Sequence, residues 1–339
     1  MPPAMPTVHT TTSPDKSNRP RIAVGCITRG RPAMFAKALS SLTKLDLPVE
    51  FEVVFCFVEN AETLSVQEEI ETFRTKVPSA EIHLTNEPRL GIPFARNRVL
   101  DLALNTGCEF LAFLDDDEIV DPLWLKNLYA TIKARDLDLV GGPVRTLAPV
   151  AALSFGRRKI LNGLIARAKR IERVAALRTA NKLDHTVSIV TNNWLVRLGF
   201  LRKTGIRFDD GLGLSGGSDI AIFREIRAAG GKTGWAPTAL VYEEIPEGRL
   251  SLSYQYARGR DQQLATYNIK RGQAGQNRMA ASIVFILAKS LLGGLRVLFS
   301  PLFGGTTLVL GLRSFGAAVG RMKGLMGRES EHYHRVAGH

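Results

Sequence analysis

The chain has 339 residues, of which 45% are hydrophobic and 23% charged, so it is long enough for one large globular domain or two small ones. Its formal net charge of +13 indicates an acidic partner, such as nucleic acid, a nucleotide phosphate or an anionic membrane surface. The three cysteines have no C-x-x-C spacing, which argues against a paired metal or redox site and favours a reduced, cytosolic compartment.

Residues 1–20 are rich in Pro, Thr and Ser and contain no apolar run of the length a signal peptide needs, so they predict a disordered tail. After them, apolar runs alternate with segments of helical spacing. The predicted strands are 21–27, 51–58, 80–85, 110–114 and 138–142, and helices are predicted to begin near residues 32, 66, 93 and 122. This alternation predicts an α/β fold whose mostly parallel central sheet is covered by helices on both faces.

The strand predicted at 110–114 runs directly into four carboxylates, Asp115 to Glu118. Carboxylates packed this closely repel one another, and hard oxygen ligands favour Mg²⁺ or Mn²⁺. Thr28 and Glu59 also end strand-like runs, and ligands of open α/β sheets bind beyond the carboxyl ends of the strands. We therefore predict a metal site at this edge, because a solvated acidic turn would not explain the buried strand aimed at it.

Residues 151–185 interrupt the alternation, with nine Lys or Arg spread among apolar residues between 157 and 182. They predict a basic amphipathic helix inserted into the catalytic domain. Two interpretations remain open for it, a solvated surface helix or contact with an anionic membrane or a phosphate-bearing acceptor.

Strand character returns at 188–196. A Gly-rich acidic loop then leads to a helix with Asp219 in its first turn, where simple charge complementation of the helix dipole is the alternative to a chemical role.

Residues 276–339 form a hydrophobic and basic segment that we expect to be helical and membrane-associated. Lys289 and Arg296 interrupt the apolar run from 280 to 312, leaving no uncharged stretch of 18 residues for a simple transmembrane helix. A helix lying in the membrane interface, with its cations toward lipid phosphates and a break at Ser300-Pro301, is the main expectation. The alternatives are a spanning helix, a hairpin packed on the catalytic domain, or an oligomer interface.

Over about residues 20–260 the chain resembles the family 2 glycosyltransferases, inverting enzymes of GT-A fold that use nucleotide-diphosphate sugars. Six motifs occur in the family's order: residues 28–32, Glu59-Asn60, 91–97 with its Ala-Arg-Asn, 115–117 as the DxD metal motif, 191–197, and Phe208-Asp209 with 216–219. Ser218 stands where the family usually has Glu. Residues 242–251 resemble the subgroup that builds succinoglycan-type exopolysaccharide (ExoM-like), with Glu where many relatives have His.

The resemblance implies a GT-A catalytic domain over 21–275 that moves a hexose from UDP-glucose or a similar donor to a hydroxyl of a growing lipid-linked polysaccharide. This transfer would take place at the cytoplasmic face of a bacterial inner membrane. Asp219 would be the general base, and Asp117 with Asp115 would hold Mg²⁺ or Mn²⁺. The expected contacts to the nucleotide sugar are Thr28, Arg31, Glu59, Arg96, Asn97, Asp115 and Asp116. A single base suits inversion, because the metal supports the leaving group and no protonating carboxylate is needed.

Other classes fit less well. A haloacid-dehalogenase-like phosphohydrolase also ends a strand in D-x-D, but early in the chain and with Thr or Val where this chain has Ile119. A basic nucleic-acid-binding protein would account for the charge, yet no aromatic platform or helix-turn-helix signature is present, so we expect no nucleic acid. A Rossmann dehydrogenase would need G-x-G-x-x-G after the first strand, which this chain lacks.

Overall fold

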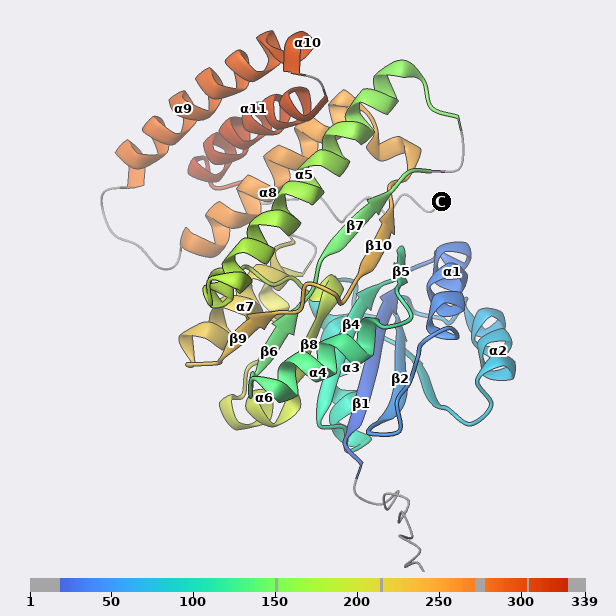
Figure 1. Ribbon diagram of the computed structural model, residues 1–339. Helices are drawn as coiled ribbons and strands as arrows, with labels where there is room; N and C mark the ends of the chain where they lie inside the picture. Colours follow the sequence, from blue (N-terminus) through green and yellow to red (C-terminus); the bar gives the residue numbers. More distant parts are fainter. Residues whose placement is uncertain (1–18, 150–151, 214–215, 272–277, 304, 329–339) are drawn as a thin grey trace, which may run out of the picture.

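The computed structural model describes residues 19–149, 152–213, 216–271, 278–303 and 305–328 (Figure 1). The predicted tail lies almost wholly outside these ranges. The centre is a seven-stranded sheet of order β3-β2-β1-β4-β8-β6-β9. Its strands are β1 (Arg21–Thr28), β2 (Glu52–Glu59), β3 (Glu81–Asn86), β4 (Phe110–Asp115), β6 (Leu139–Gly141), β8 (Trp194–Arg197) and β9 (Thr233–Trp235). Only β8 runs against its neighbours, so the expectation of a mostly parallel sheet is confirmed.

Helices cover both faces of the sheet, as the alternation predicts. They are α1 (Pro32–Leu42), α2 (Gln67–Lys76), α3 (Ile92–Asn105), α4 (Trp124–Ala134), α6 (Leu198–Thr204) and α7 (Ser218–Ala228). One core joins the sheet to α1, α2 and α4, and a second joins it to α3, α6 and α7. Phe110 of β4 lies in the first core and Leu111 in the second, so this strand is buried on both faces. Double burial explains its unbroken apolar run.

A second sheet of three short strands stands above the carboxyl edge of the first. It has the order β5-β10-β7, with β5 (Glu118–Val120), β7 (Val144–Leu147) and β10 (Val241–Glu244). Glu118 pairs with Glu243 in its register. The sequence did not predict this sheet, because strands of three or four residues carry too little alternation to be recognised.

The prediction of a strand at 188–196 is wrong for most of these residues, since only 194–197 join the sheet. Residues Thr191–Asn193 form the 3-10 turn η3 instead. The Asn193 amide donates to the carbonyls of Pro143 and Ala239, and such side-chain bonds compete with a regular ladder. In the described part of the chain, the other 3-10 turns are η2 (Asp184–Thr186), η4 (Asp210–Leu212) and η5 (Glu247–Arg249).

A layer of long helices lies beyond the small sheet (Figure 1). It contains α5 (Phe155–Ala180), α8 (Leu252–Arg271), α9 (Arg278–Leu298), the short α10 (Ser300–Phe303) and α11 (Gly305–Leu325). The predicted basic helix and the break near Ser300 are therefore confirmed. Helix α11 packs on α5, α8 and α9. A side chain at Gly316 or Gly320 would collide with the α8 backbone, so these glycines permit the close approach.

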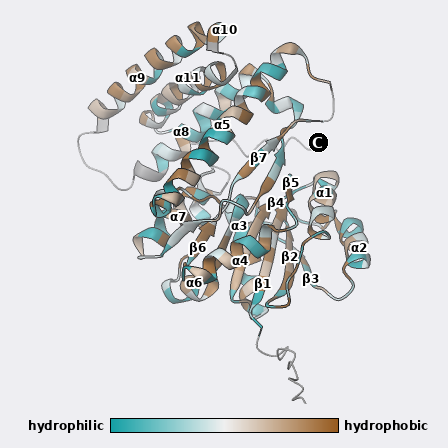
Figure 2. Cartoon of the chain, in the orientation of Figure 1, coloured by the Kyte–Doolittle hydropathy of each residue, from teal (hydrophilic) through white to brown (hydrophobic). Residues whose placement is uncertain are grey.

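Helix α9 lies outermost in this layer and is strongly hydrophobic (Figures 1 and 2). Among the described residues, Met279–Leu298 is the one stretch long and apolar enough to cross a membrane, and only 11% of it is buried. The expected orientation of its cations is wrong for Arg296, which donates to the Ser314 hydroxyl of α11 at 3.0 Å. Arg321 of α11 likewise points inward and donates to Ser282 of α9 at 3.0 Å.

Candidate active site

Three strand ends meet at the carboxyl edge of the main sheet. Thr28 of β1 is in register with Glu59 of β2, and Ile27 is in register with Asp115 of β4. The sheet therefore brings these predicted residues together. Glu59 is almost fully buried and accepts a hydrogen bond from the backbone N–H of Ser65 at 2.5 Å, so in this structure its carboxylate holds the loop after β2.

Asp116 fastens the acidic turn to the loop that follows β1. Its carboxylate accepts hydrogen bonds from the Thr28 hydroxyl at 2.7 Å and from Arg31 Nη1 at 3.2 Å. Burial raises the pKa of Asp116 to about 6, although the charge of Arg31 and the Thr28 hydrogen bond act in the opposite direction. Two of the predicted nucleotide contacts thus also fix the conformation of the turn.

Asp117 lies between Arg31, whose Nη1 is 3.9 Å from its Oδ2, and Arg249. Arg249 Nη2 lies 3.3 Å from its Oδ2, and Nη1 of the same guanidinium lies 3.0 Å from Glu243 Oε1. Burial, and then the charge of Asp117, raise the pKa of Glu243. The sequence placed Arg249 in a motif but gave it no role at the site, because only the fold of β10 and η5 brings it to residue 117.

Glu118 closes the acid cluster from the small sheet. It accepts the backbone N–H of Asp115 and the side-chain amide of Asn192, each at 2.8 Å. Burial, followed by the charges of Asp115 and Asp117, holds the pKa of Glu118 well above its usual range. Asn192 comes from η3, so this contact ties the acidic turn to the segment that resembles the family's acceptor side.

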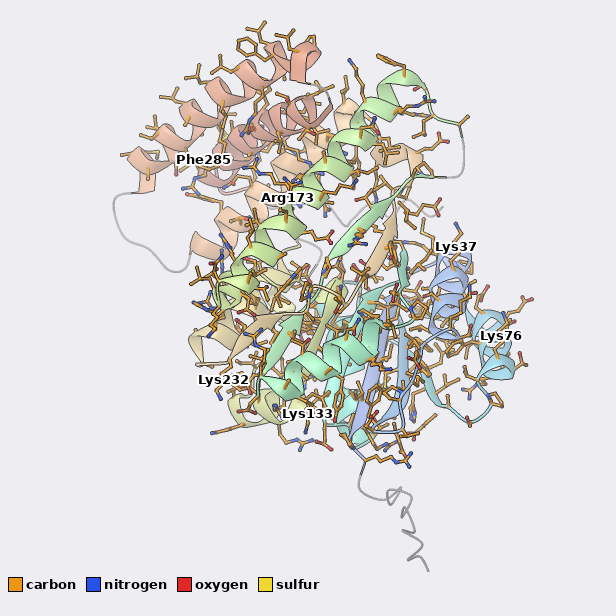
Figure 3. All side chains as sticks on the ribbon, in the orientation of Figure 1. Lys37, Lys76, Lys133, Arg173, Lys232 and Phe285 are labelled. Carbon is orange, nitrogen blue, oxygen red and sulfur yellow. The ribbon has the colours of Figure 1, made fainter. Side chains whose placement is uncertain are left out.

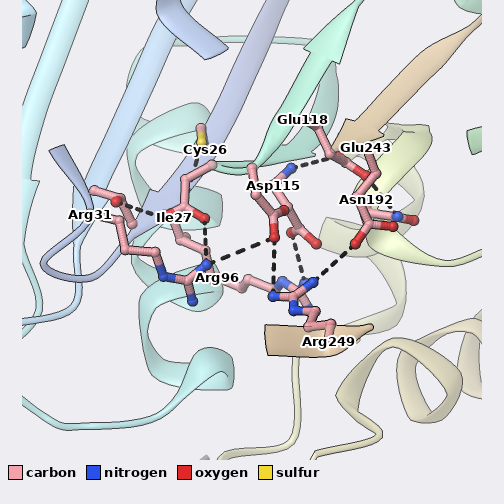
Figure 4. A network of polar contacts seen from close by, with 12 residues as sticks. Cys26, Ile27, Arg31, Arg96, Asp115, Glu118, Asn192, Glu243 and Arg249 are labelled. Atoms are coloured by element: carbon pink, nitrogen blue, oxygen red, sulfur yellow. Dashed lines mark hydrogen bonds and ion pairs between the residues drawn. The ribbon is translucent and has the colours of Figure 1, made fainter. Parts of the chain in front are cut away.

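Arg96 joins the acid cluster to Asp219. Figure 4 shows the Arg96 side chain beside Asp115. Its Nη2 lies 3.3 Å from Asp115 Oδ1, and its Nη1 donates to Asp219 and to the Ser218 hydroxyl. The Thr191 hydroxyl donates to the same oxygen of Asp219. Only 5% of the Arg96 side chain is exposed. Burial raises the pKa of Asp115 to about 7, and the charge of Arg96 acts in the opposite direction. The turn carries four carboxylates, whereas three arginines among the described residues pair with it, namely Arg31, Arg96 and Arg249, so the acids outnumber these cations.

Asn97 lies outside this network. Its amide donates to the Phe208 carbonyl and the Asp210 carboxylate, each at 2.8 Å, and its Oδ1 accepts the Phe208 N–H at 3.0 Å. These bonds anchor the loop before α7. A contact between Asn97 and the nucleotide stays a prediction.

The carboxylates suit a divalent ion that a diphosphate helps to hold. Among the described residues, no three acidic, histidine or cysteine side chains converge as a complete metal site. Mg²⁺, however, is usually bound by one or two carboxylates together with substrate phosphates, rather than by an all-protein cage. Asp115 is 37% exposed and Asp117 is 11% exposed, so both are accessible to an incoming ion. Their oxygen chemistry and excess charge fit Mg²⁺ or Mn²⁺.

The chain belongs to glycosyl transferase family 2, whose family model matches residues 24–198. It is 32% identical over 234 residues to the succinoglycan biosynthesis protein ExoM of Rhizobium meliloti (strain 1021), covering 69% of this chain and 70% of that protein. The chain is thus a family 2 glycosyltransferase related to exopolysaccharide biosynthesis. This membership favours the transferase over the phosphohydrolase and nucleic-acid-binding alternatives.

Comparison with solved structures tests the expected fold. The mannosyltransferase PcManGT from Pyrobaculum calidifontis, solved with GDP-Man and Mn²⁺, aligns with a TM-score of 0.59 at 17% identity over 94% of this chain and 91% of its own. S. aureus TarS 1-349 in complex with UDP-GlcNAc gives 0.49 at 15% identity, over 91% of this chain and 92% of that one. The expected GT-A fold is confirmed by the first of these.

Proposed function

We propose that this glycosyltransferase moves a hexose, with inversion, from UDP-glucose or a similar nucleotide-diphosphate sugar to a hydroxyl of a growing, lipid-linked polysaccharide. The observation that carries the proposal is the Arg96 bridge, since one buried guanidinium contacts both Asp115 on the donor side and Asp219 on the acceptor side. It fixes the separation between the diphosphate-binding edge and the candidate base.

Asp219 acts as the general base in this proposal. An alcohol is a weak nucleophile at neutral pH, and a positioned base contributes about 10²–10⁴-fold to the rate. Asp219 lies in the first turn of α7, and 33% of its side chain is exposed, so an acceptor hydroxyl can reach its second carboxylate oxygen. Arg96 and Thr191 orient the carboxylate through its first oxygen.

Asp117, with Asp115, would hold Mg²⁺ or Mn²⁺, which stabilises the negative charge growing on a diphosphate leaving group. Arg31 and Arg249 flank Asp117, at 3.9 Å and 3.3 Å from its Oδ2. Guanidinium groups match phosphate geometry, so both are placed to bind the diphosphate beside the acids. Thr28 and Asp116 then keep the acidic turn in place.

A panel of nucleotide sugars tests the proposal. The full chain is incubated with UDP-, GDP- and dTDP-hexoses in Mg²⁺ or Mn²⁺, and donor binding and nucleotide release are measured with and without a saccharide acceptor. We expect one donor to be bound and turned over in a metal-dependent and acceptor-stimulated way. Release of phosphate from a generic ester with no sugar donor would contradict the proposal.

We also propose that the outer face of α9 lies on the cytoplasmic leaflet of an anionic bacterial inner membrane, where the lipid-linked acceptor would be held. Seven large apolar side chains of α9 are exposed along this face: Met279, Ile283, Val284, Leu287, Leu291, Leu295 and Leu298. They follow helical spacing, whereas Arg296 and Ser282 face α11. A charge-free apolar ridge of this length suits insertion at the membrane boundary.

Replacing Val284, Leu287 and Leu291 by Gln should release the protein from vesicles. Each buried leucine contributes about 1.5–3 kcal/mol, so the triple variant should move from the pellet to the supernatant when sedimented with anionic vesicles. A matched variant with Gln at Leu47, Leu90 and Leu123, which are exposed on the catalytic unit, should sediment like the parent. Equal sedimentation of the α9 variant and the parent would contradict the membrane assignment.

A further inference from the structure

Three arginines from three different helices come together beside the acid site: Arg167 of α5, Arg258 of α8 and Arg313 of α11. The backbone of Arg313 lies directly against Gly259, the residue after Arg258, and α11 also packs on α5. Their charges are close enough to affect one another. Burial, and then the charges of Arg167 and Arg258, lower the pKa of Arg313 to about 10. Burial and Arg258 also lower the pKa of Arg167. We call these three residues the arginine cluster.

A chain of hydrogen bonds connects the arginine cluster to the acid site. Arg313 Nε donates to Gln255 Oε1 at 2.9 Å, and Gln255 Nε2 donates to the backbone carbonyl of Arg249 at 2.7 Å. The side chain of Arg249 contacts Asp117 at 3.3 Å. The cluster is therefore connected by hydrogen bonds to η5, the turn whose Arg249 faces the candidate metal ligands. It lies on the side of the C-terminal helices.

Within the described residues, the acids around Arg313 and Arg167 offset little of the charge of these two side chains. Glu243 is the acid whose charge acts on Arg313, and it already accepts a hydrogen bond from Arg249 at 3.0 Å. Within the part of the chain that the structure describes, Arg167 has no hydrogen-bond or ion-pair partner. Grouped, partly buried cations are unfavourable unless an anion joins them. All three side chains keep some exposure, so an anion can enter.

We infer that the arginine cluster binds the phosphate group that links the acceptor saccharide to its lipid carrier. This inference rests on the proposed transfer to a lipid-linked acceptor. Guanidinium groups bind phosphate through paired hydrogen bonds. The donor diphosphate is assigned to the edge at 115–117, so a second phosphate site in the helical layer serves the other substrate. The apolar face of α9 belongs to the same layer, where the carrier's hydrocarbon would lie (Figures 1 and 2).

Binding of a short prenyl diphosphate tests the inference. The full chain in neutral detergent micelles is titrated with farnesyl diphosphate, with farnesol, and with UDP in Mg²⁺. We expect the diphosphate to bind at least tenfold more tightly than farnesol, and each of Arg167→Gln and Arg313→Gln to weaken it about tenfold. The affinity for UDP should stay within twofold in Arg167→Gln, because Arg167 lies outside the hydrogen-bond chain that leads to Arg249. Arg167→Gln removes a like charge, so its melting temperature should equal or exceed that of the parent.

Arg170→Gln with Arg173→Gln is the matched control, because both residues are exposed on α5 and Arg173 is labelled there in Figure 3. This control removes two charges outside the cluster and should bind farnesyl diphosphate like the parent. Equal binding of farnesol and farnesyl diphosphate would overturn the inference. An equal loss of farnesyl diphosphate affinity in the control would also overturn it. A parallel loss of UDP affinity in Arg167→Gln would overturn it as well, because the cluster would then belong to the donor site. Because the measurement is binding, it can fail while sugar transfer to a soluble acceptor still succeeds.

Discussion

Replacing Asp219 by Asn should lower the turnover of sugar transfer by about 10²–10⁴-fold while donor binding stays within a few-fold of the parent. The amide has the size of the carboxylate, and its oxygen can still accept the hydrogen bonds of Arg96 and Thr191. It cannot take a proton from an acceptor hydroxyl. Steady-state transfer with a saccharide acceptor, together with donor titration by calorimetry, measures the two effects separately.

Glu225→Gln provides the matched control for this variant. Glu225 is exposed on the same helix, α7. Its substitution by Gln makes the same change from carboxylate to amide, but outside the contacts with Asp115 and Arg96. It should transfer sugar at close to the parent rate. Near-parent turnover in Asp219→Asn would show that Asp219 only complements the helix dipole and that the base lies elsewhere.

The sequence was sufficient for the part of the site that depends on strand ends. The run from Phe110 to Asp115 is apolar because β4 is buried on both faces, and this pattern is visible without any knowledge of neighbours. Register in a parallel sheet then places Thr28 and Glu59 near Asp115, since all three are the last residues of their strands. Local pattern and topology were enough for this inference.

The remainder of the site depends on tertiary contacts that no local pattern encodes. Arg249 reaches Asp117 across 132 residues of sequence, and Arg96 reaches Asp219 across 123. The strand expected through Thr191 to Asn193 failed for a related reason, since the asparagine amides bond to carbonyls and a carboxylate elsewhere in the chain. The sequence shows the polar residues that make such contacts, but it does not show which residues are their partners.

Replacing Asp117 by Asn should weaken UDP binding in Mn²⁺ by well over tenfold and leave binding in EDTA unchanged or slightly tighter. In Mn²⁺ the variant lacks one charged ligand, and losses of 10–100-fold in metal affinity already follow changes in residues that only support such ligands. In EDTA no ion offsets the repulsion between the acid and the diphosphate, so removing a carboxylate reduces like-charge repulsion and frees Arg249 to face the phosphates.

Titrating UDP into the parent and the variant under both conditions separates this metal role from a positioning role. Asp46→Asn changes an exposed carboxylate after α1 that is paired with Lys126 of α4, and it should match the parent in Mn²⁺ and in EDTA. If Asp117→Asn loses the same factor in both, its carboxylate acts by holding Arg249 and not by binding the ion. Asp115, the other carboxylate proposed to hold the ion, would then be its remaining ligand in the acidic turn, and Asp115→Asn should become the variant that abolishes the Mn²⁺ dependence.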